Sequence, residues 1–356
     1  MTAIRAVHQA LPNYWYGDAI GNTVTAMRGL LRQWGYASDV YADVIHDKLT
    51  AQDFRSLDGF DPQMAVIYHY STGSRVNRHI LEKARNVILM YHNVTPASFY
   101  VDYNAEAAEN CLKGRDFLRR FSGRTLGAMA VSPYNARELE AAGIGPVSVV
   151  PCLVDFSKTA VEKEAPFKDG KTNILFVGRI SPNKNHEALI KTFYFYRKHH
   201  NANSRLVLVG AYAPRDPYQK RMAELALGLG LGPEDVVFTG AVPDEALAGY
   251  YRSASAFLCL SLHEGFCIPL LEAMKFGKPV VALNSTGVAD TMDGAGALVE
   301  PGWGPHEVAE LLAQVTGNPR LAEAIVEGQA RRVEYYSWEN TVARFRGALE
   351  GALARV

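Results

Sequence analysis

The sequence predicts an α/β protein made of two doubly wound, Rossmann-like domains whose strand ends face a shared central cleft. Short apolar runs of strand length alternate with helical patterns along the chain, which is typical of parallel sheets covered on both faces. The chain of 356 residues is too long for one ordinary hydrophobic core. A polar stretch at 155–171, rich in Lys, Glu and Asp, separates two such alternating series.

The apolar runs define the expected strands in chain order. In the first half we expect strands at 4–8, 40–42, 64–68, 87–91, 126–131 and 147–150, and helices at 21–34, 75–84 and 135–142. In the second half we expect strands at 174–177, 206–209, 236–238, 256–260, 280–283 and 297–299, with helices between them. The polar stretch then serves as a linker between an N-terminal domain at 1–160 and a C-terminal domain at 161–336. Ligands of such sheets bind at the carboxyl ends of the strands.

Composition excludes several functional classes. The formal net charge is zero, which argues against a broad nucleic-acid surface. The four cysteines form no C-x-x-C pair and have no zinc-ligand spacing, so we expect reduced thiols in a cytoplasmic protein. No signal-peptide pattern opens the chain, and no stretch reaches the roughly 18–20 apolar residues of a membrane span. We expect at most peripheral contact with the inner face of a membrane.

The segment 263–274 is the most informative part of the chain. Here Glu264 and Glu272 stand eight residues apart around a glycine and a proline. An anion site flanked by two acceptors of hydroxyl hydrogen bonds suits a sugar nucleotide, with the diphosphate in the middle and a sugar at each end. The alternative is an acidic helix start that binds no ligand.

The local pattern around these glutamates predicts a strand, a tight loop and a helix. Pro269 suits a first helical turn and Gly277 suits a helix end. The backbone N–H groups of Phe266, Cys267 and Ile268 would then point out of the helix start. The helix dipole favours an anion at that place.

Two cations follow another predicted strand end. Arg179 and Lys184 lie in the segment 173–185, after a buried apolar run. Converging cations in a dry cleft can neutralise the charge that develops on a leaving diphosphate. A solvated basic loop is the alternative interpretation for this pair taken by itself.

Together these segments resemble glycosyltransferase family 4, whose members are retaining enzymes with the two-domain GT-B fold. The family pattern is Gly-Arg, a Lys a few residues on, and then Glu-Gly-Phe-Gly-x-Pro-x-x-Glu-Ala. This chain carries it as Gly178, Arg179, Lys184, Glu264, Gly265, Phe266, Pro269, Glu272 and Ala273. It departs from the pattern at Cys267, where most members have glycine. The resemblance is strong over 171–350 and weaker but continuous over the first half.

The resemblance implies roles for these residues. Arg179 and Lys184 would bind the diphosphate, Glu264 the donor sugar and Glu272 the ribose, while the backbone of Gly240 and Val242 would read a nucleobase that the sequence does not specify. The expected donor-binding set is Gly17, Arg179, Lys184, Gly240, Val242, Glu264, Gly265, Phe266, Cys267, Ile268 and Glu272. The expected catalytic set is His92, Arg179, Lys184 and Glu264.

Three features of the remaining chain also match the family. Gly17 lies in a loop that resembles, loosely, the family's glycine-rich loop, and Asp18 beside it either orients an acceptor hydroxyl or caps a helix. His92 follows a buried strand where related enzymes place a histidine that reaches the donor sugar or the transferred oxygen, with His69 as a weaker competitor. The helix at 337–356 would cross back onto the N-terminal domain, as it does in the family, rather than pack on its own domain.

The sequence therefore predicts a hexosyltransferase that retains anomeric configuration, uses a nucleoside-diphosphate sugar and needs neither a metal nor a cofactor. No two aspartates are separated by a single residue, so the Asp-x-Asp metal motif is absent. GDP-mannose is mildly preferred as donor, and the acceptor would be a saccharide or a lipid-linked saccharide in polysaccharide or glycoconjugate assembly. The alternatives are a nucleotide-sugar epimerase or hydrolase of the same fold, and a non-catalytic sugar-nucleotide-binding module.

Overall fold

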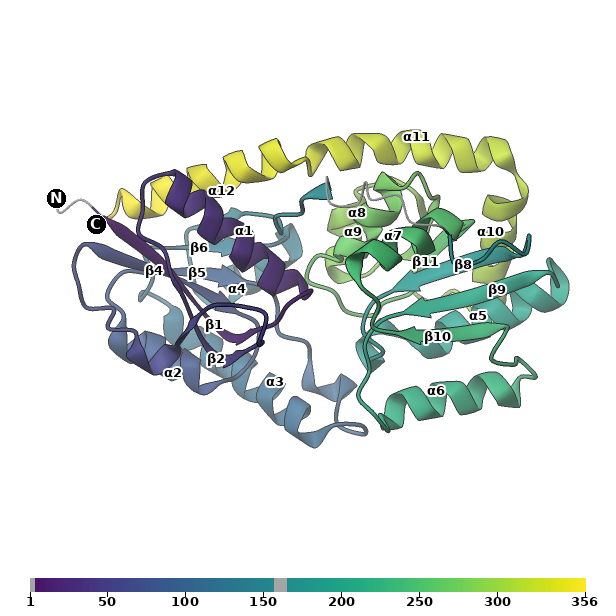
Figure 1. The fold of residues 1–356 in the computed structure, drawn as a ribbon, viewed down its shortest axis with the longest axis horizontal. Coiled ribbons are helices and arrows are strands. Elements are labelled where there is room, and N and C mark those ends of the chain that lie inside the picture. Colours follow the sequence, from purple (N-terminus) through teal and green to yellow (C-terminus); the bar gives the residue numbers. More distant parts are fainter. Residues whose placement is uncertain (1–3, 157–164) are drawn as a thin grey trace. The chain divides into compact units, whose positions relative to one another are not determined.

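The chain folds into two compact units, each built around its own sheet (Figure 1). The computed structural model describes residues 4–156 and 165–356. Unit 1 consists of Met1–Val154 and Tyr336–Val356, and unit 2 of Asp155–Tyr335. The predicted linker at 155–171 begins at this boundary, and its residues 157–164 lie outside the described part of the chain.

Unit 1 contains a seven-stranded parallel sheet with the order β3-β2-β1-β4-β5-β6-β7. Its strands are β1 (Ala6–Tyr14), β2 (Val40–Ile45), β3 (Gln52–Asp53), β4 (Met64–Tyr70), β5 (Val87–Tyr91), β6 (Gly127–Ala130) and β7 (Val147–Val149). Its helices are α1 (Ala19–Gln33), α2 (Arg75–Lys83), α3 (Ala105–Leu118), α4 (Pro133–Ala141) and α12 (Trp338–Leu353). Figure 1 shows these helices on both faces of the sheet.

Unit 2 contains a six-stranded parallel sheet with the order β10-β9-β8-β11-β12-β13. Its strands are β8 (Thr172–Val177), β9 (Ser204–Val209), β10 (Val236–Gly240), β11 (Ala256–Cys259), β12 (Val280–Leu283) and β13 (Ala297–Val299). Its helices are α5 (His186–His199), α6 (Pro217–Gly228), α7 (Asp244–Ser253), α8 (Ile268–Lys275), α9 (Thr286–Met292), α10 (Pro305–Gly317) and α11 (Pro319–Tyr335).

Both sheets follow the Rossmann strand order, in which the first and fourth strands of the unit are neighbours. The second and third strands are added on one side of the first strand, and the fourth strand is added on its other side. The loops after the first and fourth strands therefore lead away in opposite directions and leave a crevice beyond the carboxyl ends of these two strands. In unit 1 this switch point lies between β1 and β4, and in unit 2 between β8 and β11. These two places are therefore the expected ligand sites.

The first strand and the third helix differ from the sequence-based expectation. β1 extends to Tyr14, beyond the expected end at residue 8, because its later residues are also buried in the sheet. α3 was not among the expected helices because small side chains dominate its buried face, which weakens the apolar pattern. Gly114 of α3 contacts the backbone at Gly73 so closely that a Cβ on Gly114 would lie 2.5 Å from the Gly73 nitrogen.

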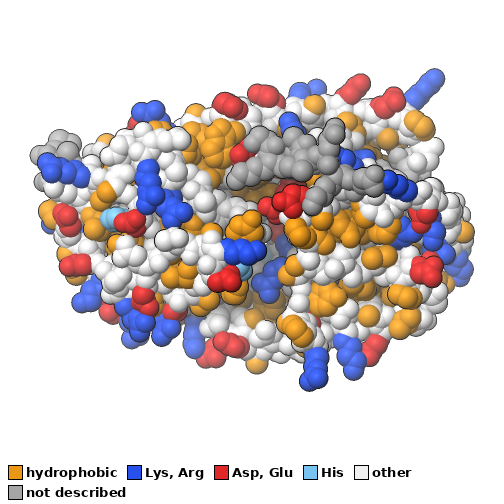
Figure 2. All heavy atoms as spheres, viewed as in Figure 1, with side chains coloured by type: hydrophobic (Ala, Val, Ile, Leu, Met, Phe, Trp, Pro, Cys, Tyr) orange, Lys and Arg blue, Asp and Glu red, His pale blue; other side chains and the backbone are white. Residues whose placement is uncertain are grey.

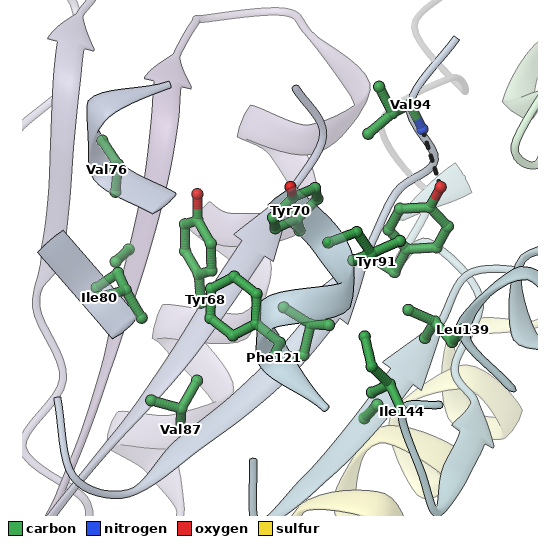
Figure 3. Packing of buried hydrophobic residues seen from close by; sticks show 14 of the residues in the cluster. Tyr68, Tyr70, Val76, Ile80, Val87, Tyr91, Val94, Phe121, Leu139 and Ile144 are labelled. Atoms are coloured by element: carbon green, nitrogen blue, oxygen red, sulfur yellow. Dashed lines mark hydrogen bonds between the residues drawn. The ribbon is translucent and has the colours of Figure 1, made fainter. Parts of the chain in front are cut away.

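Aromatic side chains fill the core on one face of the unit 1 sheet (Figure 3). The ring of Phe121 lies 5.7 Å from those of both Tyr68 and Tyr70. The hydroxyl group of Tyr91 accepts a hydrogen bond of 3.3 Å from the backbone N–H of Val94, as the dashed line in Figure 3 marks. The core thereby anchors the loop that follows β5.

The last helix, α12, belongs to unit 1. Its buried Phe345 packs on Trp34 at the end of α1, with ring centroids 5.4 Å apart. The guanidinium of Arg346 also lies over the Trp34 ring, 5.5 Å from its centroid. Beyond the helix, the guanidinium of Arg355 donates a hydrogen bond of 3.1 Å to the carbonyl of Leu126. The chain therefore returns to its N-terminal unit after completing unit 2.

Charged side chains of both signs are interspersed over the face of the molecule in Figure 2. Lys plus Arg and Asp plus Glu each number 37. On the described part of this face, the mixture leaves no broad basic area of the kind that tracks a nucleic-acid backbone. None of the described helices combines the length and the apolar character that a membrane crossing requires.

Candidate active site

The loops after β8 and β11 meet at the switch point of unit 2. The Nζ atom of Lys184 lies 2.6 Å from both carboxylate oxygens of Glu264, although the two residues are 80 positions apart. The side chain of Lys184 is 20% exposed and that of Glu264 is 9% exposed, so the ion pair is largely withdrawn from water. Burial is the largest single influence and acts to lower the pKa of Lys184, but Glu264 and the two nearby cysteine sulfurs, those of Cys267 and Cys259, together raise it, so the lysine is charged.

Two asparagines connect these loops through hydrogen bonds to backbone groups. The side-chain NH₂ of Asn183 donates to the carbonyl of His263, and the backbone carbonyl of Asn183 accepts from the N–H of Leu262. Asn185 adopts the left-handed conformation, with φ of 56°, and its side chain donates to the carbonyl of Leu260. The side-chain oxygen of Asn185 also caps α5. Because both asparagines bind backbone groups, the position of Lys184 is defined by the fold itself.

Glycines allow the backbone segments of this site to approach closely. A Cβ on Gly210, at the end of β9, would lie 1.9 Å from the carbonyl oxygen of Gly178. A Cβ on Gly287, in the first turn of α9, would lie 2.3 Å from the carbonyl oxygen of Gly265. The N–H of Gly287 donates to the carbonyl of Glu264, and the hydroxyl group of Thr286 accepts from the N–H of Glu264.

Sequence reasoning missed these supporting residues. The segment 284–287 (Asn-Ser-Thr-Gly) carries the signal that could have revealed them, because small polar residues followed by glycine often begin a helix that closely approaches another backbone. Its role became apparent only when the fold placed α9 against the loop of Glu264.

Helix α8 begins at Ile268, with a proline in its first turn, and Gly277 follows its end with φ of 63°, as the sequence predicted. Cys267 occupies the N-cap position in the left-handed conformation, with φ of 74°. The backbone N–H groups of Cys267 and Ile268 donate to no acceptor within the described part of the chain. These free donors and the helix dipole suit an anion at this end of α8.

The remaining predicted donor residues in unit 2 lie at the same sheet edge. Arg179 is exposed, and its guanidinium forms no hydrogen bond or ion pair with other residues that the structure describes. Gly240, with φ of 72°, ends β10, and its carbonyl accepts from the N–H of Gly210. Val242 follows in the half-buried loop that leads to α7. Gly265 and Phe266 lie in the loop between Glu264 and α8.

Glu272 lies in α8, and its carboxylate accepts a hydrogen bond of 2.7 Å from the buried Tyr251 hydroxyl group. Tyr251 in turn stacks on Phe276, with parallel rings 5.2 Å apart. Burial raises the pKa of Glu272, although the hydrogen bond from Tyr251 opposes this shift. The sequence did not identify Tyr251 as a partner of this carboxylate.

In unit 1, the loop after β1 carries the predicted residues Gly17 and Asp18. Gly17 has φ of 77°, which favours glycine. Asp18 occupies the N-cap position of α1, but its side chain makes no capping hydrogen bond, so side-chain capping does not explain this residue. Gly21 permits the tight loop, because a Cβ there would lie 2.0 Å from the carbonyl oxygen of Trp15.

His92 and His69, which the sequence presented as competitors, belong to one hydrogen-bonded chain. Nε2 of His92 lies 2.9 Å from Nδ1 of His69, and Nε2 of His69 lies 2.9 Å from the side-chain oxygen of Gln9. These residues come from β1, β4 and the end of β5, three neighbouring strands. His69 and Gln9 are fully buried, whereas His92 is half-buried.

The hydrogen-bonded chain determines the tautomer of each histidine ring. The side-chain NH₂ of Gln9 donates to the carbonyl of Val24, so its oxygen faces His69 and accepts from Nε2–H. Nδ1 of His69 then accepts from Nε2–H of His92, which leaves a lone pair on Nδ1 of His92. Burial lowers the pKa of His92 to about 3 and that of His69 well below its usual range, so both rings are neutral near pH 7.

Comparison with known proteins relates the chain to a family of enzymes. Residues 157–332 match the model of the family described as glycosyl transferases group 1. These residues, which include every predicted donor-site residue of unit 2, make the C-terminal half of the chain similar to the group 1 glycosyltransferases.

Curated relatives carry the names of several such enzymes. The chain is 26% identical to D-inositol 3-phosphate glycosyltransferase of Kribbella flavida, over 92% of this chain and 76% of the relative. It is 33% identical to MMP alpha-(1->4)-mannosyltransferase of Mycolicibacterium hassiacum, over 42% and 36% of the two chains. It is 29% identical to O-antigen chain mannosyltransferase B of Escherichia coli, over 47% and 42%. The chain thus spans less than half the length of two of these relatives.

Solved structures confirm the predicted GT-B fold. Sucrose-phosphate synthase from Thermosynechococcus elongatus superimposes with a TM-score of 0.77 and 18% identity, covering 99% of this chain and 100% of that one. HepE from Anabaena in complex with UDP-glucose superimposes with a TM-score of 0.71 and 17% identity, covering 97% and 98%. At these identities the likeness concerns the fold.

Proposed function

We propose that this protein is a retaining, metal-independent glycosyltransferase that moves a sugar from a nucleoside-diphosphate sugar to a hydroxyl acceptor. The observation that supports this most is the ion pair of Lys184 and Glu264 at the switch point of unit 2, with the exposed Arg179 on the same loop after β8 as Lys184. One small area thus holds two cations for a diphosphate and one carboxylate for sugar hydroxyl groups. The start of α8 adds free N–H donors there.

Donor binding would redistribute the partners within this area. Lys184 would turn to the diphosphate, and Glu264 would accept hydrogen bonds from hydroxyl groups of the donor sugar. As the bond between the anomeric carbon and the phosphate oxygen breaks, the acceptor oxygen bonds to the same face of the sugar and its proton passes to the departing phosphate oxygen. The protein contributes orientation and charge stabilisation. Glu272 would bind the ribose, and the backbone at Gly240 and Val242 would contact the base.

In unit 1, we assign His92 a hydrogen-bonding role. Its Nδ1 lone pair can accept a hydrogen bond from a substrate hydroxyl group, and its neutral ring does so without adding charge. Asp18, whose side chain makes no capping bond, would orient the acceptor hydroxyl, and Gly17 would allow the substrate to approach the backbone.

GDP-mannose remains the mildly preferred donor. Two of the relatives above are named mannosyltransferases, one of them of an O-antigen chain, which favours a saccharide or lipid-linked saccharide acceptor in polysaccharide assembly. Other relatives are named for inositol phosphate, and HepE was solved with UDP-glucose, so UDP-sugars are the main competitors.

Binding and turnover experiments test the proposal. Thermal shifts with UDP, GDP, ADP and dTDP should single out one nucleotide, because a ligand at 100 times its Kd adds about 2.7 kcal/mol to stability. Turnover of the matching donor should then require an acceptor, and the product should keep the donor's anomeric configuration. Nucleotide release without an acceptor would instead favour an epimerase or hydrolase. Binding without any turnover would favour a non-catalytic module.

A further inference from the structure

Two cysteines lie against Glu264 on the buried side of its loop. Cys259 ends β11 and is fully buried, and Cys267 precedes α8. Their Sγ atoms are 4.0 Å apart, and one carboxylate oxygen of Glu264 lies within 4.8 Å of both. We infer that Cys259, Cys267 and Glu264 form a binding site for a soft divalent cation of the zinc class.

The distances agree with this assignment. Two thiolates bound to one tetrahedral zinc ion, each at about 2.3 Å, stand about 3.8 Å from each other. The two Sγ atoms at 4.0 Å therefore need to move by only a few tenths of an ångström. Three protein ligands leave a fourth position for water or another ligand, as in zinc sites that are not purely structural. Thiolates select zinc-like ions over magnesium or calcium, which prefer oxygen ligands.

The backbone at Cys267 is the second observation. Its φ of 74° belongs to the left-handed region, which costs a non-glycine residue about 1–2 kcal/mol. Glycine would occupy this position without strain, so the chain tolerates an unfavourable conformation that places a thiol beside Cys259. Backbone strain of this kind is concentrated at functional sites.

The charges also balance. Two thiolates and Glu264 carry three negative charges, and Lys184 carries one positive charge, which leaves a net charge of −2 for a divalent cation to neutralise. Binding releases the two thiol protons.

A cation bound here would compete with Lys184 for the carboxylate of Glu264. If Glu264 binds the donor sugar, as in the proposed function, the cation and the donor exclude each other and the cation inhibits transfer. The binding site itself does not depend on that function, because its ligands and its test involve no substrate.

Titration of the reduced, full-length protein with Cd²⁺ tests the site, since cadmium bound to thiolates absorbs in the ultraviolet. We expect one equivalent to produce a saturable charge-transfer band. Cys259→Ala and Cys267→Gly should each weaken binding by more than about 100-fold, beyond the effect typical of changes outside the ligand set. Cys111→Ala, which removes a buried thiol from α3 of unit 1, is the matched control and should leave the band unchanged.

Misfolding of the variants can be distinguished from loss of the site. Glycine adopts the φ of position 267 without strain, so Cys267→Gly should fold, and the melting temperature of each variant shows whether it is folded. Absence of a one-equivalent band in the wild type would overturn the assignment, as would a band that survives Cys267→Gly. Thiols that form a disulfide with a small disulfide oxidant but give no cadmium band when reduced would also overturn it, and would favour a redox pair instead. Loss of cadmium binding would leave the proposed glycosyltransferase function intact.

Discussion

The switch points of the two units share a strand order but differ in chemistry. In unit 1, neighbouring strands are joined by a neutral chain of Gln9, His69 and His92. In unit 2, the two central loops are joined by the opposite charges of Lys184 and Glu264. Burial acts to lower the pKa of all three groups. The histidines stay uncharged because no acidic group among the described residues contacts them, whereas Lys184 stays charged because the carboxylate of Glu264 contacts it directly.

This difference shows what each arrangement can supply. A neutral hydrogen-bonded chain sets the direction of a donor and a lone pair, and it responds weakly to salt. A charged pair holds an ammonium group that a more highly charged ligand can recruit. We therefore expect unit 1 to contribute hydrogen-bond geometry and unit 2 to contribute charge stabilisation, and the following experiments test that division.

The largest effect should come from removing the cations of unit 2. Arg179→Ala and Lys184→Ala should each lower kcat by about 10²–10³, as does the loss of a donor to a developing oxyanion. Negative charge grows on the leaving diphosphate, so each cation is worth more in the transition state than in the ground state. The double variant should lose less than the product of the two effects, because both cations act on one charge. Near-wild-type kcat in the double variant would rule out the diphosphate role.

Stability measurements separate the two cations. Arg179→Ala should leave the melting temperature unchanged because Arg179 is exposed and has no partner among the described residues. Lys184→Ala should destabilise the protein by on the order of 3 kcal/mol, since it leaves the buried Glu264 carboxylate unpaired. The alternative interpretation of a solvated basic loop does not hold for Lys184, whose side chain is only 20% exposed. Adding Glu264→Gln to Lys184→Ala should restore most of the lost stability.

Glu272→Gln should weaken donor binding more than it slows the reaction. The ribose is bound similarly before and during transfer, so the hydrogen bond stabilises the ground state and the transition state almost equally. Its loss should therefore raise the donor KM more than it lowers kcat. A charge-assisted hydrogen bond of roughly 1.5–3 kcal/mol corresponds to a donor KM about 10–150 times higher. Tyr251→Phe, which leaves the carboxylate without its tyrosine partner, is the informative companion. Unchanged donor KM with greatly reduced kcat would contradict the ribose role.

Gly287→Ala tests whether α9 positions the loop of Glu264. The added Cβ would overlap the Gly265 carbonyl oxygen, so we expect a loss of about 1–3 kcal/mol in stability and weaker donor binding. The matched control is Gly328→Ala in α11, where a Cβ meets open space and should stabilise the helix by about 0.5–1 kcal/mol. Equal melting temperatures and donor affinities for the two variants would mean that the close approach is unimportant.

The neutral histidines should make stability depend on pH. His186, the first residue of α5, is fully buried like His69. Burial lowers the pKa of His92 and of His186 to about 3 in the folded protein, against about 6.5 when unfolded. The unfolded chain therefore binds more protons between these values, and stability should fall as pH drops from about 6.5 towards 3, by up to about 1.4 kcal/mol per pH unit for each such histidine. Glu272, whose pKa is raised, opposes this trend. Denaturant unfolding at pH 6.5, 5.5 and 5 measures how steeply the free energy of unfolding changes with pH. This slope gives the number of protons taken up on unfolding, which His92→Gln should reduce by about one. A flat profile would contradict neutral burial.

The smallest expected effect is that of chelation. Turnover should survive EDTA because Arg179, Lys184 and the start of α8 would neutralise the diphosphate without a metal. Adding back manganese or magnesium serves as the control. Complete loss of activity in EDTA with rescue by either ion would overturn the metal-independent mechanism.

The sequence was sufficient to predict the fold class because the relevant signals are local. Apolar runs and helical patterns identified nearly every strand, and the proline and Gly277 marked the ends of α8 within a residue. It missed α3, whose buried face is made of small residues, and it treated His69 and His92 as alternatives. Both errors have one cause: small-residue packing and hydrogen bonds across strands leave no periodic trace in the chain.

By itself the sequence determined two parallel-sheet units and the residue types of a charged, glutamate-flanked site. Only the tertiary structure decided how those residues are paired. It joined Lys184 to Glu264 across 80 positions, linked Gln9 to two histidines across three strands, and set the thiols of Cys259 and Cys267 4.0 Å apart. Elements are specified by neighbours in the chain, whereas the charge and protonation of a buried group depend on whatever distant side chain the fold brings against it.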